Sequence, residues 1–222
     1  MAEPSDPAAV LRIAFVPGVT PGKWLRTWEH RYPDQPLEAR LVEEATQRQV
    51  LDDGTADMCF VRLPLDPEDL HLIPLYDELA VAVVGAEHPA AAYDELTLAD
   101  LADDHRVDDP ALSARQRVAT VAAGTGHAVM PMSVARLHHR RDVRHVRLTD
   151  VPPTTVGLAW PVEGGGPLVE TFIGIVRGRT ERSTRGAVTA DAARATPPAR
   201  GRSRRPAPAS RGRSRRRGRR RA

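Results

Sequence analysis

The sequence has a single cysteine, Cys59, and lacks any apolar run of the roughly 18 residues that a membrane span requires. One cysteine rules out an internal disulfide and fits a reducing compartment. Because Cys59 lies in an apolar stretch, we predict a buried and inert thiol. The first ten residues, MAEPSDPAAV, carry acids and prolines where a secretory signal would carry basic residues and an unbroken apolar stretch. We therefore expect a cytoplasmic protein that does not bind membranes.

The short motifs of enzymes, nucleotide sites and metal sites are also missing. The patterns G-x-S-x-G, H-E-x-x-H and G-x-x-x-x-G-K-[ST] do not occur. The pair His138-His139 falls on a predicted helix, where adjacent side chains diverge by about 100°, and no cysteine or acid lies at ligand spacing. A solvated helix end explains this pair better than a metal site. We expect no enzymatic activity, no cofactor and no bound metal.

Acidic residues are absent from the last 29 positions, Arg194 to Ala222, which contain 13 arginines. Residues 1–193 hold the other 19 of the 32 Lys and Arg residues against all 29 Asp and Glu residues, so this part carries a net charge of −10. From about Ser183 the chain consists mostly of Ala, Pro, Gly, Ser and Arg, which cannot bury enough apolar surface to fold. We predict a disordered basic tail at 183–222.

Arginine-rich flexible arms bind phosphate backbones by releasing counterions. The tail repeats Arg-Gly-Arg at 200–202 and 211–213, which is similar to an AT-hook only in part, because Ser203 and Ser214 stand where proline is expected. DNA is the expected partner, while RNA, polyphosphate and the acidic body of the same chain remain alternatives. The arginines expected to make this contact are Arg200, Arg202, Arg204, Arg205, Arg211, Arg213, Arg215, Arg216 and Arg217.

The first third of the chain alternates between short apolar runs and amphipathic segments. Leu11 to Val16 predicts a buried strand that ends at Pro17-Gly18, followed by a helix with Thr20 as N-cap and Pro21 at its first position. Further strands are predicted at 37–42 and 56–61, with a helix at 46–52 that Gly54 ends. Strand and helix in strict alternation predict a parallel α/β sheet.

The later segments are predicted from similar signals. They comprise one or two strands at 75–84, a turn and short helix at 88–104, a helix before the glycines at 124 and 126, a strand at 127–131, a helix opening at Ser133, strands at 143–148 and 155–160, and a last helix at 168–177. Residues 105–113 are too polar to assign. The whole pattern predicts an α/β protein.

Ordered motifs between residues 10 and 180 resemble the effector-binding domain of LysR-type transcriptional regulators. They are RIAF at 12–15, YP at 32–33, LxxGxxD at 51–57, LY at 75–76, HP at 88–89, LxxL at 98–101, VAAGTGHAVMP at 121–131, VGLAW at 156–160 and FIGIVRGR at 172–179. The resemblance implies a two-lobed periplasmic-binding-protein type II-like fold, a small-molecule effector in the cleft between the lobes, and pairing into dimers.

Two departures from that family accompany the resemblance. The effector-type domain begins near residue 11, so the family's N-terminal helix-turn-helix is not seen, and between Asp104 and Arg117 the chain is too short for the family's usual strand, helix and strand. We expect a shortened second lobe. The expected domains are a flexible N-terminus at 1–10, a LysR-type substrate-binding domain at 11–182 with its first lobe at about 11–88 and 161–182 and its second at about 89–160, and the tail.

Candidate ligand contacts follow the predicted strand ends, where helix N-termini present free N–H groups. Thr20, Thr46 and Arg62 follow the first three strands, and Gly18 lies in the first turn. The resemblance adds Pro131 and Ser133 from the second lobe. A carboxylate would suit the Arg62 guanidinium. Each position also has a simpler explanation: Thr20, Thr46 and Ser133 as helix-start residues, and Arg62 paired with Asp66 or Glu68.

These expectations combine into one function. We predict a protein that senses a small organic effector, with an anion as one candidate, and that contacts nucleic acid through its tail. It would thus act in transcriptional regulation as a homodimer or beside a related regulator. Two alternatives stay open. One is a ligand-free module that pairs with an intact regulator, and the other is a solute-binding protein.

Overall fold

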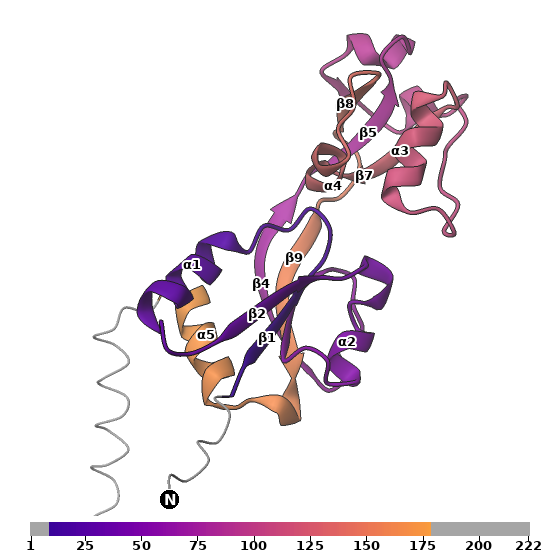
Figure 1. The fold of residues 1–222 in the computed structure, drawn as a ribbon. Helices are drawn as coiled ribbons and strands as arrows, with labels where there is room; N and C mark the ends of the chain where they lie inside the picture. Colours follow the sequence, from indigo (N-terminus) through magenta and orange to yellow (C-terminus); the bar gives the residue numbers. More distant parts are fainter. Residues whose placement is uncertain (1–8, 179–222) are drawn as a thin grey trace, which may run out of the picture. The chain divides into compact units, whose positions relative to one another are not determined.

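The computed structural model of the protein describes residues 9–178 (Figure 1). They form two sheets, one of five strands in the order β2-β1-β3-β9-β4 and one of four in the order β6-β8-β5-β7. The strands are β1 Leu11–Phe15, β2 Leu37–Leu41, β3 Met58–Arg62, β4 Leu70–Glu78, β5 Ala80–Gly85, β6 Glu95–Leu96, β7 His127–Pro131, β8 Val143–Leu148 and β9 Thr154–Pro161. The helices are α1 Gly22–Arg31, α2 Gln49–Asp52, α3 Ala114–Ala122, α4 Met132–Leu137 and α5 Pro167–Val176, with 3-10 turns η1 Glu44–Thr46, η2 Pro89–Ala92, η3 Ala99–Leu101 and η4 Val162–Gly164.

The five-stranded sheet is mixed rather than parallel. Strand β1 pairs in parallel with β2 and β3, as predicted, whereas β9 runs antiparallel to both β3 and β4. The prediction of an all-parallel sheet was therefore wrong for its last two strands. Local alternation of strand and helix determines only the first part of the chain, because β9 enters from about ninety residues further on, a long-range pairing that no local pattern encodes.

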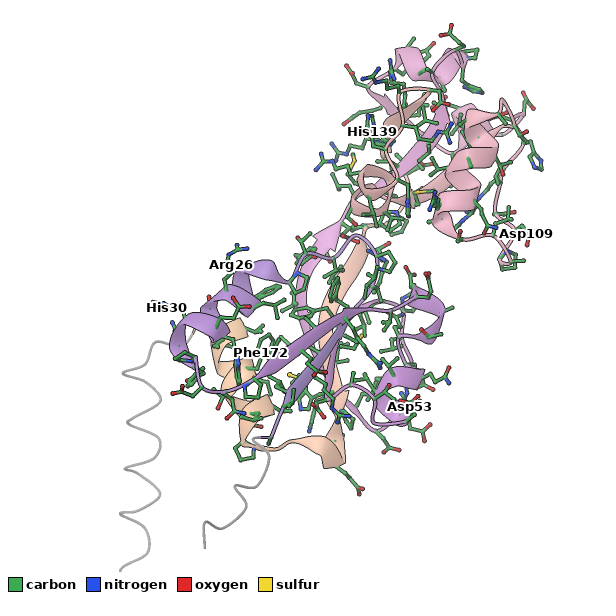
Figure 2. The ribbon with its side chains drawn as sticks, viewed as in Figure 1. Arg26, His30, Asp53, Asp109, His139 and Phe172 are labelled. Atoms are coloured by element: carbon green, nitrogen blue, oxygen red, sulfur yellow. The ribbon has the colours of Figure 1, made fainter. Side chains whose placement is uncertain are left out.

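An aromatic core covers one face of this sheet. Helices α1 and α5 lie side by side on that face, and α2 lies on the other (Figure 1). The rings of Trp28 and Phe172 are 5.9 Å apart, and Trp24 stacks on Phe60 at 5.0 Å. Phe172 is fully buried between α5 and the strands (Figure 2). Burial of such rings is worth about 1.5 to 3 kcal/mol each, so a chain with few aromatics concentrates them where they stabilise the fold.

The α2 face holds Cys59, which is fully buried as predicted. Burial raises the pKa of its thiol to about 12, so the thiolate is not available at neutral pH. The predicted helix at 46–52 is divided into η1 and α2, and Gly54, at φ +66°, ends it. A glycine adopts this left-handed conformation without steric cost, which explains the stop at this position.

The four-stranded sheet is built on β5, whose Ala and Val side chains are buried on both faces. Helix α3 covers one face, and its start is fixed by a capping box: the Ser113 hydroxyl accepts from the Gln116 N–H, and the Gln116 side chain accepts from the Ser113 N–H. This cap lies in the polar stretch for which the sequence predicted no element. Within residues 105–113 the structure has a single isolated bridge, from Arg106 to His127.

Two predicted helix caps were wrong. Helix α1 begins at Gly22, and Pro21, which already has helical backbone angles, occupies the N-cap position without a side-chain bond. Thr20 is exposed one residue before it. Ser133 is the second residue of α4 rather than its cap, because Pro131 precedes the helix. In both cases a proline fixes the chain direction, and the neighbouring hydroxyl is left for other contacts.

The chain passes between the sheets at Leu79 and again within residues 149–153. Strand β5 therefore belongs to the second sheet and β9 to the first, whereas we expected the lobe boundaries near residues 88 and 161. We call the parts that contain these sheets the first lobe and the second lobe.

Candidate functional site

Arg62, the last residue of β3, is the centre of the candidate site. Its side chain is 2% exposed and contacts four other residues. Nη1 lies 2.7 Å from Glu44 Oε2, and both Nε and Nη2 lie within 3.0 Å of Glu78 Oε2. Nη2 also donates to the Pro17 carbonyl at 3.0 Å and, more weakly, to the Ser133 hydroxyl at 3.4 Å. The guanidinium is therefore fully engaged, with two carboxylates against one positive charge.

The two carboxylates differ in burial. The Glu78 side chain is 6% exposed, whereas that of Glu44 is 52% exposed. A buried carboxylate needs its counter-charge far more than a solvated one does. Glu78 thus holds Arg62 in place, and Glu44 covers the side of the guanidinium that faces solvent.

Gln47 fixes the backbone of the same residue. Its side-chain oxygen accepts from the Arg62 N–H at 2.8 Å, and its side-chain nitrogen donates to the Arg62 carbonyl at 2.9 Å. This pair of hydrogen bonds imitates a neighbouring strand at the point where β3 ends, and it satisfies both polar groups in a buried place. The position of Arg62 is therefore set by main chain and side chain together.

Gly18 contacts the second lobe directly. It has φ +86°, and a Cβ at this position would lie 2.6 Å from the Ser133 Oγ and 3.0 Å from the Val134 nitrogen. Only glycine fits both the backbone angle and the space. The turn that follows β1 thus serves as a close contact between the lobes, on the same hydroxyl that Arg62 reaches.

A cleft of about 700 Å³ lies beside these contacts, and residues of both lobes line it. Its charged groups are Glu43, Glu44 and Arg117. The Arg117 Nε is buried and has no hydrogen-bond partner within residues 9–178. The remaining lining residues are Pro17, Ala45, Gln47, Pro110, Ala111, Leu112, Ser113, Ala114, Gln116, Val129, Met130, Pro131 and Val134.

The structure brings together part of the predicted set. Gly18, Arg62 and Ser133 meet in one cluster, and Pro131 lines the cleft beside it. Thr20 and Thr46 are not among the lining residues, and the Thr46 hydroxyl donates to the Glu43 carbonyl within its own turn. The nine tail arginines from Arg200 to Arg217, and the expected disorder of 183–222, lie outside the described residues.

Four residues of the site were missed: Glu44, Gln47, Glu78 and Arg117. We expected Arg62 to pair with Asp66 or Glu68, but its partners lie 18 and 16 residues away along the chain. Nothing in the sequence marks Glu78 as buried, because it follows an exposed Asp77 at the end of β4. The one available signal was the arginine itself, since a charged residue that ends a fully apolar strand needs a buried partner.

A second hollow, of about 680 Å³, is lined by the second lobe alone, including Gly85, His88, Val121 and Arg141. None of the predicted contacts lines it. The cleft beside Arg62 is therefore the better candidate for a ligand site.

Comparison with known proteins agrees with this geometry. Residues 4–111 match the LysR substrate binding domain. The chain carries a LysR substrate-binding domain. The HTH-type transcriptional regulator CatR of Pseudomonas putida is 31% identical over 146 residues, which are 53% of this chain and 50% of CatR. The chain thus spans about half the length of this relative.

Solved structures show that the LysR-type fold extends beyond residue 111. The effector binding domain of a BenM variant aligns with a TM-score of 0.63 at 19% identity, covering 78% of this chain and 97% of that one. The OxyR regulatory domain from Pseudomonas aeruginosa aligns at 0.60 and 23% identity, covering 77% and 97%. A Corynebacterium glutamicum OxyR mutant gives 0.61 and 22%, covering 84% and 68%. The two-lobed effector-domain fold that we predicted is confirmed.

Two further observations concern the described part of this LysR-type domain. No helix between residues 9 and 178 is both long and apolar enough to cross a membrane. In the same range, no group of three or more His, Cys, Asp or Glu side chains is arranged to hold a metal ion. The domain is thus an effector-binding domain of the kind found in transcriptional regulators.

Proposed function

We propose that this chain binds a small organic effector in the cleft between its lobes and thereby acts in transcriptional regulation. The observation that carries the proposal is the cleft of about 700 Å³, which both lobes line and which the Arg62–Ser133 contact borders. This volume lies within the range of about 300 to 1,000 Å³ in which small-molecule sites occur. A ligand-free domain would more simply fill that space with side chains.

The charges of the cleft bear on the kind of effector. An anion was expected because Arg62 was expected to be free, but Glu44 and Glu78 already neutralise it. Two carboxylates, Glu43 and Glu44, and one guanidinium, Arg117, line the walls. Such walls repel a dianion and suit a molecule that carries a donor or ammonium group beside a carboxylate. A small zwitterion or an amine-bearing acid is the proposed class.

A binding screen with a filled cleft tests this proposal. The probes are amino acids, the matched acids without the amine, and the matched amines, measured by calorimetry with the full chain. Ala45 is exposed on η1 and lines the cleft, whereas Ala99 is exposed on η3 away from it. Ala45→Trp should weaken binding at least tenfold, and Ala99→Trp should leave it unchanged. Equal affinity in both variants, or no saturable binding of any probe, would favour a ligand-free module that pairs with an intact regulator.

The proposed contact with nucleic acid involves the tail arginines. Thirteen arginines without an acid between Arg194 and Ala222 give the charge that backbone binding requires. If all 13 engage duplex DNA, the slope of log K against log salt reaches about −12. Changing the nine arginines of the predicted contact set to glutamine should reduce that slope by about 8. A slope that stays unchanged would assign the tail to another partner, such as RNA or the acidic body.

A further inference from the structure

The segment from Arg136 to Arg147 concentrates positive charge in an otherwise acidic body. Its sequence, RLHHRRDVRHVR, holds five arginines, three histidines and one acid, within the 193 residues whose net charge is −10. It contains the His-His-Arg-Arg run, for which the effector site supplies no use. The run spans the end of α4, the turn after it and most of β8.

Only part of this charge is compensated. Arg140 pairs with Asp142 at 2.7 Å, and Arg147 pairs with Glu95 at 2.8 Å. Within residues 9–178, the other three arginines, Arg136, Arg141 and Arg144, form no ion pair with a carboxylate, and all three are exposed. Arg144 Nη1 donates to the carbonyls of Arg141 and Val143, which fixes its head beside the turn without neutralising it. Three guanidinium groups therefore remain open to an anion.

The histidines of the segment report the positive field. Burial lowers the pKa of His145, and the neighbouring charges of His139 and Arg136 lower it further. Burial also lowers the pKa of His138, with a contribution from Arg115 that Glu43 opposes. His145 Nε2 is buried with no hydrogen-bond partner in the described part of the chain. Residues from α3, α4, the turn and β8 thus face one another with few acids between them.

The backbone leaves this surface accessible. Strand β6 pairs only with Arg147 and Leu148, so the first half of β8 has β5 on one side and no strand on the other within residues 9–178. Val143 and Val146 point into the core, while Arg144 is exposed at that edge. Figure 2 shows His139 at the outer side of α4 and β8, among side chains that end in nitrogen.

We propose that this α4–β8 surface, defined by Arg136, His139, Arg141 and Arg144, binds the phosphate backbone of nucleic acid. Guanidinium groups bind phosphate through paired N–H donors, and such contacts position a protein without reading sequence. The body repels polyanions elsewhere, so contact is confined to this surface. The basic tail cannot dock on it, because like charges repel, but both can lie on one polyanion. The proposal goes beyond the tail contact because it places a binding surface in the folded domain.

The test compares two variants of the full chain that each lose three positive charges. The first is Arg136→Gln with Arg141→Gln and Arg144→Gln, and the second, a matched control on exposed helix positions of the first lobe, is Lys23→Gln with Arg26→Gln and Arg177→Gln. Both are titrated with a duplex of about 30 base pairs across a salt series. The first should lower the magnitude of the salt slope by about 2.7 and weaken binding tenfold or more near 0.1 M salt. The control should change the slope by less than about 0.5, because its charges do not contact the duplex.

Two further measurements separate the α4–β8 surface from the tail and from a protein partner. In chains whose nine tail arginines are also glutamine, the difference between the two triple variants should persist, so failure of the proposed tail contact does not mimic failure of this one. Sedimentation without DNA tests the competing occupant, an acidic face of a second copy. Equal salt slopes in both triple variants overturn the proposal, as does loss of self-association in the first variant with unchanged DNA binding. Melting curves confirm that both variants fold.

Discussion

The contrast between Glu44 and Glu78 gives the sharpest prediction about stability. Both carboxylates bind the same guanidinium at 2.7 to 2.9 Å, but one side chain is 52% exposed and the other 6%. Breaking a buried pair by removing one partner costs about 3 to 5 kcal/mol, whereas an exposed pair contributes at most about 1 kcal/mol. Because Glu44 remains as a counter-charge, we expect Glu78→Gln to destabilise by about 3 kcal/mol, at the lower end of that range. Glu44→Gln should cost less than about 1 kcal/mol.

These magnitudes are readily measured. For a domain of this size, 1 kcal/mol shifts Tm by about 2 to 4 °C, so Glu78→Gln should lower Tm by about 6 to 12 °C and Glu44→Gln by less than about 4 °C. Urea unfolding gives the free energies directly. Arg62→Met alone should be at least as harmful as Glu78→Gln, since it leaves a buried carboxylate without a counter-charge, and Arg62→Met with Glu78→Gln should recover part of the loss. Equal effects of the two glutamate variants would refute the reasoning from burial.

The remaining predictions concern two glycines and two histidines. A Cβ on Gly126, at φ +55°, would lie 1.8 Å from the His105 carbonyl oxygen, whereas one on Gly124, at φ +91°, meets nothing within 4 Å; in urea unfolding Gly124→Ala should cost about 1 to 2 kcal/mol of left-handed strain and Gly126→Ala at least about 1 kcal/mol more, and similar costs would contradict the close approach of the residue 105 carbonyl. The folded-state pKa values of His138 and His145 lie below the usual value of about 6.5, so the unfolded chain binds protons first and stability, complete above about pH 6.5, should fall as the pH drops below it. Replacing both with Gln should flatten that part of a pH series of urea midpoints, and an unchanged slope would count against the cause.

The elements that the sequence predicted correctly are those that local forces determine. Strand β8 was predicted with the bounds that it has, and α1 with its buried Trp24 and Trp28, because apolar spacing and the prolines and glycines around them act over a few residues. The N-terminal caps failed where a proline supplied the helix start instead. A rule that assigns the hydroxyl nearest the helix cannot detect that substitution.

The site was predicted in part for a different reason. Gly18, Arg62 and Ser133 were named from strand ends and a family likeness, and they do meet. The partners that decide their chemistry, Glu44 and Glu78, were not, because a buried ion pair depends on which strands become neighbours. Strand β4 is brought to the sheet by β9, so the burial of Glu78 is a consequence of tertiary structure alone.

Glu78 is the last residue of β4, and Leu79 follows it as the chain passes to the second lobe. The Leu79 carbonyl accepts the N–H of Met132 at 2.9 Å, next to the serine that Arg62 reaches. One guanidinium is therefore tied both to the crossover segment and to the wall that would swing. Any hinge motion that turns the backbone at residue 79 must stretch bonds to Arg62, so the electrostatics of a single side chain set the stiffness of the hinge.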